Sequence, residues 1–239
     1  MTSNTNLTRL AMVGYGKMGQ LIESMAQRHG FEVVLRLDEF NNAQGAGLTK
    51  EGFLHVDVAI EFSTPESAPA NLKRLAQLGI PAVAGTTGWT AHLAEVSEEV
   101  NKCGTALVWS PNFSVGVAVF RKVVEMSAAA LAKEPSYGAW AWEIHHDMKK
   151  DAPSGTLALL VEDMKRAGYQ RRIDVASNRA GMHPGTHEIG FDSAADTITI
   201  RHEARSREGF ALGALKSARW ILGRKGVFTF EDVLFGGSK

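Results

Sequence analysis

The chain has 239 residues, of which 44% are hydrophobic and 22% are charged, values that suit a globular protein with one large domain or two modest ones. Its 26 basic residues equal its 26 acidic residues, which argues against a nucleic acid or an acidic membrane surface as a partner. Cys103 is the sole cysteine, so an intrachain disulfide is excluded, and we expect a cytoplasmic protein because neither a signal core nor an apolar run of membrane-spanning length is present.

Strands and helices are predicted to alternate through the first 110 residues. Short apolar runs indicate buried strands at residues 10–13, 32–37, 56–62, 81–84 and 105–109. Helical spacing of the apolar residues predicts helices at residues 18–29, 66–78 and 90–102. This alternation is typical of a doubly wound parallel sheet, so we expect an α/β fold in this part of the chain.

The pattern changes near residue 113. The following elements are predicted: helices at 115–132 and 156–167, and strands at 137–144, 171–177, 187–191 and 197–204. Alternation of Trp140, Trp142 and Ile144 indicates a half-buried sheet that is mixed or antiparallel. A last helix at 209–222 precedes a short tail that could return to the first part. We therefore expect one domain from residues 1–113 with 209–239, and an α+β domain from residues 114–208.

A glycine-rich segment at residues 14–19 fits the pattern G-x-G-x-x-G between a predicted strand and a predicted helix. Gly14 would allow the tight turn, Gly16 the approach of a pyrophosphate, and Gly19 the close packing of helix and strand. Asp38 ends the second strand, where a carboxylate can bind ribose hydroxyls. The alternatives are an ordinary glycine-rich turn and a solvated loop acid.

Three further loops follow predicted strands, at residues 61–66, 85–88 and 110–114. The carboxyl ends of the strands in an open α/β sheet meet at one edge, which is where ligands bind. Each loop alone could be simple turn chemistry, but their common edge favours a binding site.

The densest cluster of polar chemistry lies at residues 145–156. Imidazoles such as His145 and His146 can move protons near neutral pH, and the Lys149 ammonium can hold a carboxylate. Gly155 and Thr156 open a predicted helix, whose free N–H groups bind anions. On a regular strand the two histidines point to opposite faces, so only one would face a site. A metal site is disfavoured because no third ligand stands at ligand spacing and Lys149 would repel a cation.

Two further histidines lie on the later predicted strands. His202 shares the apolar side of its strand with Ile198 and Ile200, so we interpret it as a core or interface residue. The sequence leaves the role of His187 open.

Four segments occur in an order that resembles a known family: residues 14–19, 85–88, 110–117 and 145–156. The family is 4-hydroxy-tetrahydrodipicolinate reductase, also called dihydrodipicolinate reductase, of bacterial and plant lysine biosynthesis. The likeness covers nearly the whole chain. Its block H-H-x-x-K-x-D-x-P-S-G-T is highly specific, whereas the glycine-rich loop alone is not.

This resemblance implies a Rossmann domain built from the N-terminal part and the C-terminal tail, with a middle segment for substrate binding and tetramer formation. It also implies hydride transfer from NADH or NADPH to 4-hydroxy-tetrahydrodipicolinate, which yields tetrahydrodipicolinate and water. By the same likeness His145 is the proton donor or acceptor, Lys149 assists it, and His146, Gly155 and Thr156 contact the substrate carboxylates. The implied cofactor-binding residues are Gly14, Gly16, Lys17, Met18, Gly19, Asp38, Phe62, Ser63, Gly85, Thr86, Thr87, Ser110, Asn112 and Phe113, and no metal is expected.

The chain departs from the family pattern at a few positions. Glu61 stands where Asp is common, a change that we expect to be neutral. Glu39 follows Asp38 where some members carry Arg, so two acidic side chains would meet a 2′-phosphate. We therefore expect NADH to be used at least as well as NADPH, unless Arg36 or Lys17 reaches the phosphate.

Two other functions are compatible with a dinucleotide loop. Another dehydrogenase of the same fold, for example one acting on aspartate, would not need the block at residues 145–156. A non-catalytic NAD-binding sensor would tolerate loss of His145 and Lys149, and it would usually carry an effector or DNA-binding segment, which the sequence does not show.

Overall fold

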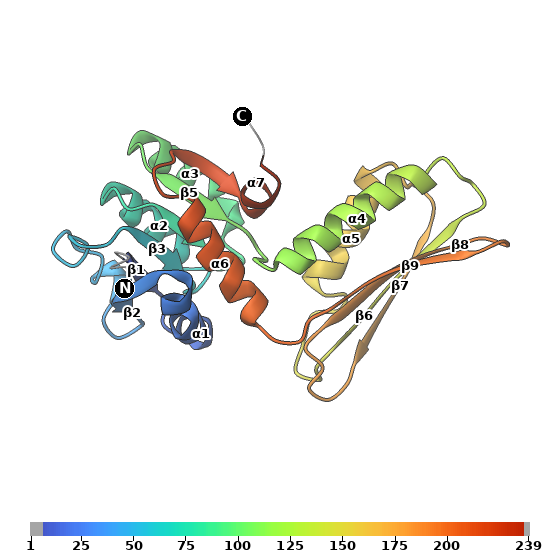
Figure 1. Cartoon of the computed structure of the whole chain (residues 1–239), viewed down its shortest axis with the longest axis horizontal. Coiled ribbons are helices and arrows are strands. Elements are labelled where there is room, and N and C mark those ends of the chain that lie inside the picture. Colours follow the sequence, from blue (N-terminus) through green and yellow to red (C-terminus); the bar gives the residue numbers. More distant parts are fainter. Residues whose placement is uncertain (1–6, 237–239) are drawn as a thin grey trace, which may run out of the picture. The chain divides into compact units, whose positions relative to one another are not determined.

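The computed structural model describes residues 7–236 and divides into two compact units (Figure 1). The first unit contains the chain up to Ser114 and again from Phe210, and the second contains Val115–Gly209. No helix within the described residues is long and apolar enough to cross a membrane.

Parallel strands form the centre of the first unit. Its described residues contain a six-stranded sheet in the order β10-β5-β4-β3-β1-β2. The strands are β1 Thr8–Val13, β2 Phe31–Leu37, β3 Val58–Glu61, β4 Ala82–Ala84, β5 Ala106–Trp109 and β10 Gly226–Thr229. Every ladder in this sheet is parallel, which confirms the predicted α/β class. The C-terminal tail returns to this sheet and forms β10 beside β5. The sequence predicted that the tail could return but did not predict this strand.

Helices and short 3-10 turns connect these strands. They are α1 Lys17–Ala26, α2 Ala68–Gln77, α3 Leu93–Lys102, α6 Glu208–Trp220 and α7 Phe230–Phe235, with turns at Gln27–His29, Ala43–Gly45 and Thr90–His92. Helix α2 begins later than predicted, because residues 64–67 form a turn in which the Ala68 N–H donates to the Thr64 carbonyl at 3.0 Å. Strands β3 and β4 are buried along their whole length, as expected for a sheet covered on both faces.

A mixed sheet organises the second unit. Within the described residues 115–209, four strands pair in the order β7-β6-β8-β9, with β6 and β7 parallel and the other pairs antiparallel. The elements are α4 Val115–Leu131, β6 Gly138–His145, α5 Gly155–Arg166, β7 Ile173–Arg179, β8 Thr186–Asp192 and β9 Thr197–Glu203. Helices α4 and α5 pack on one face of the sheet around a buried core that includes Ala141, Leu160 and Ile189. The expected mixed sheet is therefore present.

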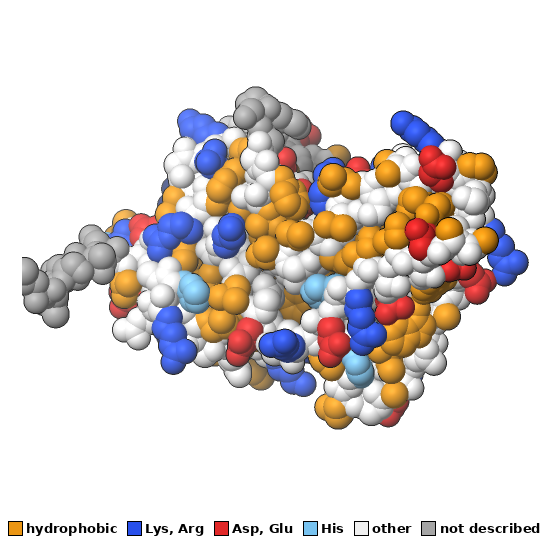
Figure 2. Space-filling model, turned by 45° about the vertical axis from the view of Figure 1, so that its right-hand side comes forward, with side chains coloured by type: hydrophobic (Ala, Val, Ile, Leu, Met, Phe, Trp, Pro, Cys, Tyr) orange, Lys and Arg blue, Asp and Glu red, His pale blue; other side chains and the backbone are white. Residues whose placement is uncertain are grey.

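The other face of this sheet carries the tryptophans. Trp140, Trp142 and Ile144 point away from the helices and remain half-buried. Trp140 covers Gly190 on β8, where a Cβ atom would lie 2.0 Å from the indole ring. Figure 2 shows hydrophobic side chains interspersed with charged ones on the visible surface. The half-burial of these side chains fits the half-buried sheet that the alternation predicted, and the same face also carries Glu188 and Arg201.

Candidate functional site

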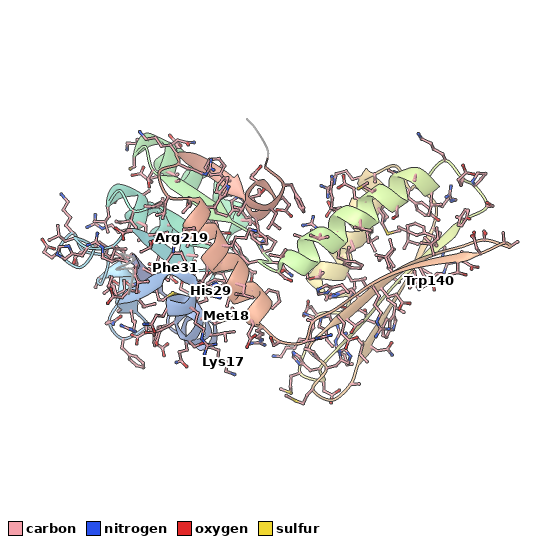
Figure 3. All side chains as sticks on the ribbon, viewed as in Figure 1. Lys17, Met18, His29, Phe31, Trp140 and Arg219 are labelled. Carbon is pink, nitrogen blue, oxygen red and sulfur yellow. The ribbon has the colours of Figure 1, made fainter. Side chains whose placement is uncertain are left out.

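Loops after three adjacent strands line a pocket of about 440 Å³ in the first unit. The lining residues are Gly16, Lys17, Met18, Phe62, Ser63, Pro65, Gly85, Thr86 and Thr87. All follow the carboxyl ends of β1, β3 and β4, the edge at which α/β sheets bind ligands. The structure thus brings together most of the predicted cofactor-binding residues, and Figure 3 shows Lys17 and Met18 at the start of α1.

Each glycine of the first loop has a physical reason to be glycine. Gly14 has a φ of +95°, and a Cβ there would lie 2.1 Å from the Phe62 carbonyl oxygen. A Cβ on Gly19 would lie 2.5 Å from the Gly14 carbonyl oxygen, so this glycine lets α1 approach the strand. No described atom lies within 4 Å of the Cβ position of Gly16, which leaves room for a ligand. These residues fit a nucleotide pyrophosphate at the positive end of the α1 dipole.

Asp38 follows β2 directly and organises the next turn. Its Oδ1 accepts hydrogen bonds from the N–H groups of Phe40 at 2.9 Å and Asn41 at 3.1 Å. The neighbouring Arg36 is bound to Glu23 on α1, with its Nε 3.0 Å from a carboxylate oxygen. Arg36 is therefore already paired, while Lys17 is exposed at the start of α1.

The predicted cofactor residues after β5 comprise a polar turn, Ser110 and Asn112, and a buried aromatic residue, Phe113. Ser110 Oγ accepts from the Asn112 N–H at 3.2 Å and donates to the Asn112 carbonyl oxygen at 2.8 Å, which forms a tight turn. Phe113 is 2% exposed and packs against Phe62 and Phe230, with ring centroids 6.4 Å and 5.0 Å away. Its ring belongs to the core, and contact of these three residues with a cofactor remains a prediction.

In the second unit, a buried carboxylate and two imidazoles form the centre of the 145–156 cluster. Glu143 and His145 lie two positions apart on β6 and point to the helix-covered face, where Glu143 is completely buried. The strand register places Glu143 opposite His187 on β8, and His187 opposite His202 on β9. These side chains form one row across the sheet. His202 packs on Phe120 with ring centroids 5.9 Å apart, which supports its interpretation as a core residue.

Glu143 connects the elements around it through both carboxylate oxygens. Oε1 accepts from the Ser154 N–H at 2.8 Å and from Arg179 Nη2 at 3.2 Å. Oε2 lies 3.0 Å from His145 Nδ1 and 3.6 Å from His187 Nε2. Burial opposes the charge, but hydrogen bonds from Ser154, Ser177 and Arg179 outweigh it and hold the pKa of this carboxyl below its usual range.

The two imidazoles respond to burial in the same direction. Burial lowers the pKa of His145, with a further decrease from the Lys149 and Arg179 charges, and the Glu143 carboxylate offsets part of this decrease. Burial and the charge of His145 lower the pKa of His187 to about 4, so His187 is neutral at pH 7. A Cβ at Gly185 would lie 2.9 Å from His145 Nε2, so glycine at that position leaves the nitrogen uncovered.

Helix α5 begins directly beside this cluster. Ser154 caps it by accepting from the Leu157 N–H at 3.2 Å, and its Oγ also lies 3.1 Å from His187 Nε2. Gly155 and Thr156 form the first turn, which carries no acidic residue. The Glu143 contact to the Ser154 N–H therefore holds the start of a helix that can receive an anion.

Lys149 and Asp151 form an ion pair in the loop between β6 and α5. Lys149 Nζ lies 2.7 Å from Asp151 Oδ1 and 2.9 Å from Oδ2. Arg179 binds the backbone carbonyls of Lys149 and Asp151, so the guanidinium connects this loop to Glu143. His146 follows the end of β6 and is half-buried. The structure thus gathers His145, Lys149, Gly155 and Thr156 around one network.

Glu143, His145 and His187 also offer three possible metal ligands, whose ligand atoms lie within 4.8 Å of one another. The sequence argument assumed that no third ligand accompanies His145 and His146. This assumption is wrong for His145, because Glu143 lies two positions earlier on β6 and His187 lies on the paired strand β8. Arg179 and Ser154 already bind two members of this triad, and the Arg179 and Lys149 charges oppose a cation. The arrangement therefore suits an oriented imidazole better than a metal.

Sequence reasoning missed Glu143 and His187 as members of the site. A signal for Glu143 was present, since a charged residue two positions before His145 in an apolar strand shares its face. His187 carried no such signal, because its position depends on the pairing of β6 with β8.

Comparison with known proteins gives one family. The family model of dihydrodipicolinate reductase, N-terminus, matches residues 8–113, and that of its C-terminus matches residues 116–234. A 4-hydroxy-tetrahydrodipicolinate reductase of Christiangramia forsetii is 36% identical over 94% of this chain and 97% of its own length. The enzyme of that name from Archaeoglobus fulgidus is 34% identical over 95% of this chain and 99% of its own length.

Solved structures show the same fold. The dipicolinate-bound dihydrodipicolinate reductase of Paenisporosarcina sp. TG-14 has a TM-score of 0.79 at 22% identity, covering 93% of this chain and 97% of that one. The amine dehydrogenase of Mycobacterium smegmatis has a TM-score of 0.64 at 9% identity, covering 94% and 95%. At such identities these similarities concern the fold alone.

We predict that Glu143→Gln lowers the pKa of His145. The amide can still accept the Ser154 hydrogen bond but no longer supplies the negative charge that offsets burial. An NMR titration of the imidazole signals measures this directly. Glu188→Gln, on the opposite face of the same sheet, is the matched control and should leave the His145 pKa unchanged. An unchanged or higher pKa in the Glu143 variant would contradict the assigned electrostatics.

Proposed function

Because the chain belongs to the dihydrodipicolinate reductase family, we propose that it reduces 4-hydroxy-tetrahydrodipicolinate with NADH or NADPH in lysine biosynthesis. The reaction adds a hydride and a proton to the substrate and releases water. The observation that carries the proposal is the folding of residues 145–156 around Glu143, which places a proton carrier beside an anion-binding helix start. The pathway is cytoplasmic, and we propose the same location for this protein.

His145 is the proposed proton donor. The overall reaction consumes one proton, and the lowered pKa of this imidazole makes its protonated form a stronger acid. Nδ1 lies toward Glu143, so Nε2 is the nitrogen left for the substrate. The Glu143 carboxylate, with Oε2 3.0 Å from Nδ1, would stabilise the protonated imidazole by its charge.

The substrate carboxylates would bind to groups of the same loop and helix. We assign one carboxylate to the N–H groups and hydroxyl at Gly155 and Thr156, with His146 nearby in the chain. Lys149 would exchange its ion pair with Asp151 for the substrate and support proton transfer through its charge. These assignments rest on the first turn of α5, which carries no acidic residue, and on the family resemblance.

The first unit would hold the cofactor in the pocket after β1, β3 and β4. When bound, the nicotinamide supplies the hydride. Gly14, Gly16 and Gly19 admit the pyrophosphate, Asp38 would bind the ribose hydroxyls, and the residues after β4 and β5 would surround the nicotinamide end. This division gives residues 1–113 and 209–239 the cofactor role, and residues 114–208 the substrate and oligomer role.

We predict that His145→Ala and Lys149→Ala each lower turnover by roughly 10²–10⁴-fold, as loss of a positioned proton-transfer group does. The measurement follows nicotinamide absorbance with substrate made in place by the preceding synthase of the pathway. His92→Ala, an exposed histidine of the first unit, serves as the control. Turnover near that of the unaltered protein in both variants would remove these residues from the mechanism.

We predict that Thr156→Val weakens the binding of pyridine-2,6-dicarboxylate, because the hydroxyl and N–H at the helix start no longer act together on one carboxylate. Isothermal titration gives the affinity without turnover. The control is Thr199→Val, an exposed threonine of β9 in the same unit. Equal affinities in both variants would exclude the proposed anion site.

We further propose a homo-oligomer, and the family resemblance implies a tetramer. Trp140 and Trp142 are half-buried on the sheet face that α4 and α5 leave uncovered in the second unit, and this face also carries Arg201. Light scattering at micromolar concentration should therefore give a multiple of the 25.9 kDa chain mass. A monomeric mass would refute the oligomer.

We predict that NADH is used at least as well as NADPH. Asp38 and Glu39 would both face a 2′-phosphate, and repulsion on the order of 1 kcal/mol corresponds to about a fivefold loss in kcat/KM. Arg36 is held by Glu23, so Arg36→Ala should not change the ratio of kcat/KM for the two cofactors. A clear NADPH advantage would mean that Arg36 or Lys17 overrides the acidic pair.

A further inference from the structure

Strand β3 ends in a second completely buried glutamate, Glu61. In the described residues 7–236 it is paired with no Lys, Arg or His, in contrast to Glu143 with its Arg179. Burial of a carboxylate without a cation is expensive, and burial raises the pKa of Glu61 above its usual range. Glu61 must therefore be held by hydrogen bonds rather than by an ion pair within the described residues.

Glu61 holds the loops that line the cofactor pocket without lining the pocket itself. Its Oε1 accepts from the Ser63 N–H at 3.1 Å and from the Ser63 hydroxyl. The same N–H also donates to Thr86 Oγ1 at 2.8 Å, so one contact joins the loop after β3 to the loop after β4. Ser63 and Thr86 are both pocket residues.

Two further contacts lock these loops from either side. Asn71 on α2 is buried and donates to Ser63 Oγ at 3.3 Å. On the other side the Phe62 ring packs over Gly85, where a Cβ would lie 2.0 Å from the ring. The two loops that line the pocket are thus held in place by a polar network that joins Glu61, Ser63, Thr86 and Asn71.

We propose that Glu61 is a positioning residue for the dinucleotide, whose Oε1 holds Ser63, and through Ser63 the contact to Thr86, in the shape that receives the cofactor. This inference rests on the proposed function, because that function identifies the ligand of the pocket. Oε1 of Glu61 acts as a hydrogen-bond acceptor, a role that the amide oxygen of glutamine can take over. Glutamine should therefore replace Glu61, whereas leucine of similar volume should not.

The test is cofactor binding to the enzyme without substrate, followed by the change in NADH fluorescence. Glu61→Gln should bind NADH within about twofold of the unaltered protein, and Glu61→Leu about tenfold or more weakly, as loss of buried hydrogen bonds implies. In steady state, the KM for NADH should rise in Glu61→Leu while the KM for the substrate stays constant. The affinity for pyridine-2,6-dicarboxylate should be the same in both variants.

A second variant keeps the test decisive where Glu61→Leu fails to fold, as thermal melting would reveal. Asn71→Ala disturbs the same network from outside the pocket and should weaken NADH severalfold, whereas Asn101→Ala on the exposed side of α3 should not. Two results would overturn the proposal: a folded Glu61→Leu or Asn71→Ala that binds NADH normally, or a Glu61→Gln as weak as Glu61→Leu. Failure of the unaltered protein to bind NADH would instead reject the proposed function, and the proposal with it.

Discussion

The proposed substrate site depends on the contacts that the buried Glu143 carboxylate makes. It is completely buried, and its partners come from α5, β7 and β8 as well as its own strand. Removal of one partner of a buried ion pair typically costs about 3–5 kcal/mol, so Arg179 and Glu143 constrain each other strongly. Because the same carboxylate contacts His145 and the Ser154 N–H, it fixes the proton carrier and the anion-binding helix start in one geometry.

The two units surround their buried glutamates with different partners. Glu143 has a guanidinium and several N–H or O–H donors, which stabilise the ion and turn it into an electrostatic partner for an imidazole. Glu61 has hydrogen-bond donors but no cation among the described residues, and burial raises the pKa of its carboxyl. The same residue type thus contributes charge at one site and hydrogen-bond geometry at the other, and the presence of a neighbouring cation decides between them.

Local features of the sequence predicted most of the fold and part of the site. The glycine-rich turn at residues 14–19 and the helix that begins near Gly155 and Thr156 depend on neighbours in the chain, so both were predicted without a structure. The pairing of Glu143 with His187 depends on strand register, and β10 gains its place from β5, far away in the sequence. The replacement of the common Asp by Glu61 was expected to have no effect. Nothing in the neighbouring sequence reveals that Ser63 contacts both Glu61 and Thr86.

The coupling between Glu143 and the α5 start can be measured by a double-mutant cycle. Affinities for pyridine-2,6-dicarboxylate would be determined for Glu143→Leu, which removes the acceptor of the Ser154 N–H, for Thr156→Val, for the double variant and for the unaltered protein. If Glu143 holds the helix start for the carboxylate, the combined loss should differ from the sum of the single losses by about 0.5 kcal/mol or more. Additive losses within about 0.3 kcal/mol would show that the two residues act independently, and would contradict the central role of Glu143.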